Sequence, residues 1–126
     1  MKINVTVIAN CNDALVFVNR KNHAYTLPVG EQDEGNENLT QAAVRILYEK
    51  ANILVRSDDL YAIAVYSYSG VNFVFYVDLE VEHLESTKNT KLISYKRLPV
   101  LSSEQEMIIK NAFETIVNGK VKFLCL

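Results

Sequence analysis

The amino-acid sequence predicts an α/β fold of the mixed α+β kind, in which one mixed β-sheet lies between helices. Several short segments alternate apolar and polar residues, which predicts strands. Two longer segments have apolar residues at every third or fourth position, which predicts amphipathic helices. Because a sheet and a helix each bury an apolar face, the helices are expected to cover the two faces of the sheet.

Three strands are expected in the first part of the chain. Segment 3–9 alternates strictly, so its apolar side chains share one face: Ile3, Val5, Val7 and Ala9. A second strand is expected at 14–19, which is rich in branched and aromatic residues. A short third strand at 24–27 ends at Pro28, and the polar stretch 20–23 fits the tip of a hairpin.

An acidic segment and a helix follow. Residues 29–38 contain two Gly, four acidic residues and one apolar side chain, so a loop is expected there. The helix is expected at 39–51, with a buried stripe made of Leu39, Ala42, Ala43, Ile46 and Leu47. Asn38 and Gln41 fit a capping box at its start. Asn52 suits the left-handed residue that ends a helix.

The second half of the sequence predicts more strands and a second helix. Segments 60–68 and 71–80 are expected to form a hairpin around Ser69-Gly70. The further expected elements are a polar loop at 83–90, a strand at 92–96, a helix that ends at Gly119 and a strand at 121–124. Either Ser102 or Ser103 is expected to cap this helix, and Glu106 would complete a capping box from Ser103.

Composition bounds the classes of protein to which the chain can belong. Its 126 residues, 49% of them hydrophobic, are expected to form a single domain (1–126) with its own core. The net charge of −2 gives no signal for nucleic-acid binding. No apolar run reaches the length that crosses a bilayer, so a cytoplasmic protein without a membrane partner is expected. The two cysteines, Cys11 and Cys125, fit reduced thiols rather than a disulfide scaffold.

The segment from Gly30 to Ile53 resembles the Nudix box. The family pattern is Gly, five residues, Glu, seven residues, Arg-Glu, an aliphatic, any residue, Glu-Glu, any residue, Gly and an aliphatic. Glu37 and Arg45 are separated by seven residues, as in the pattern. Three later positions also fall in register: Leu47, Glu49 and Ile53. The resemblance implies a Nudix-like α/β/α sandwich.

The same segment departs from the Nudix pattern at four places. Gly30 lies seven residues before Glu37, where the pattern has six. Ile46 replaces the Glu that follows the Arg. Lys50 replaces the second Glu of the Glu-Glu pair, and Asn52 replaces the Gly. The resemblance is thus to a degenerate box.

The resemblance also implies roles for particular residues. In the family, carboxylates on this helix bind Mg²⁺ or Mn²⁺, which neutralises a pyrophosphate and acidifies water, and the Arg orients the carboxylates. The implied catalytic residues are Glu49 and Arg45, and the implied metal ligands are Glu49 and Glu37. The candidate substrate contacts are Gly30, Glu31, Lys50 and Tyr76. Any Mg or Mn is expected to bind weakly, because Ile46 cannot ligate a metal and Lys50 carries a positive charge.

The expected function is binding of a nucleotide-like small molecule, a nucleoside diphosphate linked to another group (NDP-X). Pyrophosphohydrolase activity is expected to be weak or lost. One alternative is an active hydrolase that uses Glu49 with loop carboxylates, for which Glu82 and Glu85 are candidates. Another is a small αβ interaction domain unrelated to Nudix. A homodimer is also considered, because dimers are frequent in the family.

Overall fold

The computed structural model describes residues 2–19, 24–67, 70–98, 101–118 and 122–125. Its elements in chain order are β1 (Ile3–Cys11), β2 (Ala14–Asn19), β3 (Tyr25–Thr26), β4 (Val29–Glu31), α1 (Leu39–Ala51), η1 (Ser57–Asp59), β5 (Tyr61–Ser67), β6 (Val71–Asp78), η2 (Val81–Leu84), β7 (Thr90–Ser94), η3 (Tyr95–Arg97), α2 (Ser103–Asn118) and β8 (Lys122–Cys125). The expected hairpin tip at 20–23, Ser69 and Gly119 lie outside the described residues.

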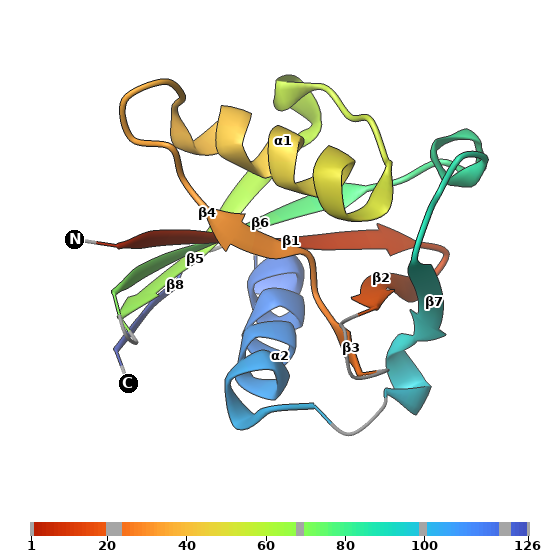
Figure 1. Ribbon diagram of the computed structural model, residues 1–126. Helices are drawn as coiled ribbons and strands as arrows, with labels where there is room; N and C mark the ends of the chain where they lie inside the picture. The colour runs from red at the N-terminus through yellow and green to blue at the C-terminus, as the bar shows by residue number, and fades with distance from the viewer. Residues whose placement is uncertain (1, 20–23, 68–69, 99–100, 119–121, 126) are drawn as a thin grey trace.

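One mixed sheet lies between the two α-helices, as Figure 1 shows with α1 above it and α2 below. In the described residues this sheet has eight strands, six of them in the order β3-β2-β1-β6-β5-β8, while β4 pairs with β1 and β7 with β2. The central pair, β1 and β6, is parallel, and the β5–β6 pair is antiparallel. The predicted fold class, a mixed sheet between helices, is therefore confirmed.

The alternation of β1 divides the core into two layers. Val5, Val7 and Ala9 pack with α1, together with Phe75 and Val77 of β6. On the other face of the sheet a second cluster packs with α2, and its members include Ile8, Leu15, Phe17, Val74, Tyr76 and Ile109. Because neighbouring residues of a strand point to opposite faces, one sheet serves both layers.

The expected loop at 29–38 is wrong for its first three residues, which form β4. This strand is antiparallel to β1, with Gly30 opposite Val5. The composition of β4 does not predict a strand. Pairing with β1, rather than the β-propensity of its own side chains, holds this segment in the sheet. The strand expected at 24–27 is shorter, since the backbone N–H of Leu27 donates to Gln105 Oε1 at 3.4 Å instead of continuing the sheet.

Three expectations in the second half also need correction. The strand expected at 92–96 is Thr90–Ser94, because its first residues pair with β2, and a 3₁₀ turn follows it. The loop expected at 83–90 includes the end of the 3₁₀ turn η2. Ser102, rather than Ser103, caps α2, since Ser102 Oγ accepts a hydrogen bond from the N–H of Gln105 at 3.2 Å. The box between Ser103 and Glu106 is therefore wrong.

The two ends of α1 are as predicted. Asn38 Oδ1 accepts from the N–H of Gln41 at 2.8 Å, and Gln41 Oε1 accepts from the N–H of Asn38 at 2.9 Å. At the other end Asn52 has φ 56° and ψ 37°, the left-handed conformation that ends a helix. None of the helices in the described segments is long and apolar enough to cross a membrane.

Candidate functional site

The candidate site is built around α1 and the acidic segment that leads into it. Ile46 is fully buried, and so is Leu47, as the helical periodicity predicts. Gly30 of β4 lies against Ile46, and a Cβ placed on Gly30 would approach Ile46 Cγ1 to 3.0 Å. The absence of a side chain at position 30 therefore lets α1 pack close to β4.

Arg45 joins the acidic segment to the helix. Its Nη2 lies 2.7 Å from Glu37 Oε1, and its Nε donates to the same carboxylate at 3.0 Å. Its Nη1 lies 3.2 Å from Glu49 Oε2, as predicted for residues four apart on a helix. Its Nη2 also donates to the backbone carbonyl of Glu31 at 2.7 Å. One guanidinium thus fixes two carboxylates and the end of β4.

The Glu37 carboxylate is the most enclosed acidic group of this network, with 11% of its side chain exposed. It also accepts the backbone N–H of Asp33 at 2.9 Å, and Gln32 Nε2 donates to the carbonyl of Glu37 at 3.1 Å. The hydrogen bonds from Arg45 hold the pKa of Glu37 below its usual value, and the bond from Asp33 acts in the same direction against the effect of burial. Glu37 therefore stays ionised and paired.

Lys50 has no such partner. It is exposed on the last turn of α1, one turn beyond Ile46. Within the described segments, no ion pair or hydrogen bond engages its ammonium group. Glu31, another predicted substrate contact, points its carboxylate to Lys2, with Oε1 2.9 Å from Nζ.

Tyr76 lies apart from these residues. It belongs to the buried cluster on the α2 side of the sheet, whereas Arg45 and Glu49 lie on α1. Its hydroxyl donates to Asp78 Oδ1 at 2.5 Å, and burial, followed by this bond, raises the pKa of Tyr76. The structure thus does not bring Tyr76 together with the other predicted site residues.

The carboxylates of α1 do not form the donor set that a hard divalent cation needs. Glu37 and Glu49 are both hydrogen-bonded to Arg45, and Ile46 points into the core. No cluster of three or more Asp, Glu, His or Cys side chains suited to a metal occurs among the residues that the structure describes. Mg²⁺ gives up its bound water reluctantly, so a tight site needs several protein oxygens around the ion. These residues therefore do not fit a tightly bound Mg²⁺ or Mn²⁺.

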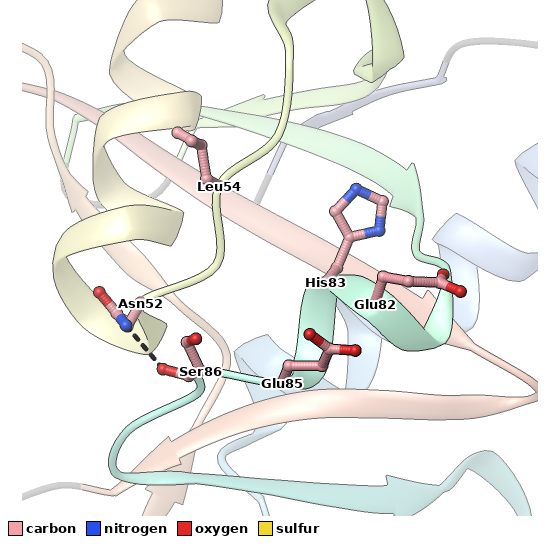
Figure 2. Close-up of a pocket in the computed structure, with 6 residues that line it drawn as sticks. All are labelled: Asn52, Leu54, Glu82, His83, Glu85 and Ser86. Atoms are coloured by element: carbon pink, nitrogen blue, oxygen red, sulfur yellow. Dashed lines mark hydrogen bonds between the residues drawn. The ribbon is translucent and has the colours of Figure 1, made fainter.

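A cleft of about 250 Å³ opens at the C-terminal end of α1. Figure 2 shows its six lining residues: Asn52, Leu54, Glu82, His83, Glu85 and Ser86. Asn52 Nδ2 donates to the carbonyl of Ser86 at 2.6 Å, which attaches the loop after η2 to the end of the helix. Glu82 and Glu85, the predicted replacement bases, thus lie in one cleft. Its volume is below the roughly 300 Å³ at which ligand pockets usually begin.

Sequence reasoning missed the partner of Glu37. The resemblance implies Glu37 as a metal ligand, and the structure shows its carboxylate hydrogen-bonded to Arg45. The seven-residue spacing between them was visible in the sequence. That spacing alone says nothing about contact, because Glu37 precedes the helix and its direction depends on how the acidic segment folds back. Asn52 was predicted only as a helix end, and its bond to Ser86 gave no sequence signal.

No family model and no curated protein sequence matches this chain. Solved structures do match it. A NUDIX hydrolase from Nitrosomonas europaea has a TM-score of 0.77 at 22% identity, over 99% of this chain and 78% of that one. An ADP-ribose pyrophosphatase from Streptococcus suis has a TM-score of 0.74 at 14% identity, over 98% of both chains.

A third similar structure contains a ligand. The NUDIX domain of Shewanella oneidensis NrtR, complexed with ADP ribose, has a TM-score of 0.69 at 17% identity, over 90% of this chain and 87% of that one. At these identities the comparisons establish the fold alone. The chain therefore has a Nudix-like fold.

Proposed function

We propose that residues 1–126 form one Nudix-like domain that binds an NDP-X small molecule and hydrolyses its pyrophosphate slowly or not at all. The observation that carries this proposal is the Arg45 network. It joins the segment before α1 to Glu37 and Glu49, with contacts of 2.7 and 3.2 Å. This arrangement supports the resemblance of the segment to a Nudix box, although positions 46 and 50, where the family pattern has Glu, carry Ile and Lys.

The chemical reason for weak hydrolysis lies at positions 46 and 50. Ile46 can neither accept a proton nor bind a metal, and it is fully buried. Lys50 places a cation where the family pattern has a carboxylate. Loss of a general base costs roughly 10²–10⁴ in rate, and a weak divalent-metal site adds to this loss. Glu49 and Arg45 would be the residual catalytic groups.

The nucleotide-like ligand is inferred by analogy of fold. One structure with this fold is complexed with ADP ribose and another is described as an ADP-ribose pyrophosphatase. Gly30, Glu31 and Lys50 are the proposed contacts near the diphosphate. Tyr76 is not included, because it is 7% exposed and faces α2. The shared fold also argues against the alternative of an αβ domain unrelated to Nudix.

An active hydrolase remains the second candidate, and the cleft in Figure 2 favours it. Glu82 and Glu85 line this cleft beside the end of α1, and no ion pair or hydrogen bond among the described residues engages either carboxylate. An unpaired carboxylate close to the helix is the kind of group that can replace a missing base. On this candidate, replacing both residues by Gln abolishes turnover.

A screen separates the two candidates. ADP-ribose, UDP-glucose, NADH, nucleoside triphosphates, dinucleoside polyphosphates and capped RNA would be incubated with Mg²⁺ or Mn²⁺ while binding and product formation are both measured. The proposal expects binding of at least one NDP-X compound with little or no product. Rapid hydrolysis that depends on Glu82 or Glu85 would establish the active enzyme instead.

Localisation and the absence of a membrane or nucleic-acid partner are proposed from composition, and a homodimer from the resemblance to the family. The chain is proposed to act in the cytoplasm, without a membrane or nucleic-acid partner. A homodimer is also proposed. Sedimentation of the purified protein at several concentrations would show whether two copies associate.

A further inference from the structure

Lys50 is an exposed residue in the last turn of α1, four positions after the buried Ile46. Ile46 and Lys50 are four residues apart, so they lie above one another on the same side of the helix. Ile46 is fully buried against Gly30, whereas Lys50, one turn later, is exposed. Of the two positions at which the family pattern has Glu beside Glu49, only position 50 therefore reaches solvent.

Two other cations, Arg45 and Lys2, are already paired. Every nitrogen of the Arg45 guanidinium donates to an oxygen of Glu37, Glu49 or Glu31. Lys2, the cation near β4, is paired with Glu31 at 2.9 Å. The ammonium of Lys50, in contrast, has no partner in the described part of the chain. It is thus the cation on α1 that is available to an anionic ligand.

We propose that Lys50 takes over the charge-neutralising role of the divalent cation, so that this chain binds the diphosphate of its ligand without metal. The inference rests on the proposed function and goes beyond it by stating the cofactor dependence of binding. A lysine acts on phosphate as a point charge with three rotatable donors, so it needs no fixed coordination geometry. Its one charge offsets only part of a diphosphate, which predicts modest affinity that decreases with salt.

The test is isothermal calorimetry of the whole chain with ADP-ribose and UDP-glucose, first in excess EDTA and then in Mg²⁺. Lys50→Gln removes the charge. Lys110→Gln is the matched control, because Lys110 is an exposed lysine on α2, on the other side of the sheet. We expect binding in EDTA, no gain from Mg²⁺, and affinity reduced about fivefold by Lys50→Gln, the size of one solvent-screened ion pair. Lys110→Gln is expected to bind like the wild type.

Each of the following results would contradict the inference about Lys50, and they differ in whether they also contradict the proposed function. Binding that needs Mg²⁺ would contradict a metal-free site but leave the proposed function intact. Binding in EDTA that ignores Lys50→Gln would remove the role of Lys50 and keep the NDP-X ligand. Absence of binding under every condition would contradict both the inference and the proposed function.

Discussion

At the scale of single residues, Arg45 holds the acidic segment against α1. Its partner Glu37 is 11% exposed, so loss of the guanidinium leaves a poorly solvated carboxylate without its main donor. We expect Arg45→Ala to lower the free energy of unfolding by about 2 kcal/mol, measured by urea denaturation. The control is Arg56→Ala, because Arg56 and Asp58 are 81% and 85% exposed and 3.6 Å apart. It should cost at most about 0.5 kcal/mol, and equal losses for both variants would contradict this role of Arg45.

The lowered pKa of Glu37 gives a pH dependence whose sign is fixed. The folded state favours the ionised carboxylate, so the stabilisation is present above the ordinary Glu pKa and is lost as pH falls through the lower, folded pKa. Glu37→Gln should therefore melt below the wild type near neutral pH. The gap in melting temperature should narrow as the pH falls below about 4. A gap that stays constant down to acid pH would show that the ion pair is not its source.

At the scale of elements, the limits of α1 could be predicted because they depend on local chemistry. Asn38, Gln41 and Asn52 act within one turn of the helix. The start of the acidic segment could not be predicted, since β4 is three residues long and forms only because β1 lies beside it. The same holds for the contact of Arg45 with Glu37, which requires the segment to fold back.

The structure also defines how the family pattern could be restored on α1. Lys50→Glu changes an exposed residue and should leave the melting temperature nearly unchanged. Ile46→Glu places a carboxylate at a fully buried position and is expected to cost several kcal/mol. Where the double variant stays folded, binding should become metal-dependent and hydrolysis should rise. Lys50→Glu alone should already make ligand binding respond to Mg²⁺.

Calorimetry with Mn²⁺ and thermal melts would check these variants together. A folded double variant that gains neither metal binding nor turnover would show that other parts of the catalytic site are missing too. Unchanged metal binding in Lys50→Glu would show that Glu49 and position 50 do not face the same ion.

At the scale of the whole molecule, the alternation of apolar residues was enough to predict the layers. The helices cover both faces of the sheet, as expected: the apolar faces of β1 and β6 pack on α1, and α2 covers the other side. What the sequence did not indicate is which face each candidate site residue would occupy relative to the others. Tyr76 and Phe75 are neighbours on β6 and point to opposite faces of the sheet. Tyr76 therefore packs with α2 and lies away from Glu49. Pairing between distant strands decides such positions.

We propose that this Nudix-like chain binds an NDP-X ligand but does not cleave it at an ordinary enzymatic rate. Phosphorus NMR tests it most directly, because one sample reports both events. The tightest-binding ligand would be mixed with an equal amount of protein and Mg²⁺. We expect diphosphate resonances that shift or broaden on binding and persist for hours. Conversion to monophosphate products at roughly 1–10³ per second would contradict it.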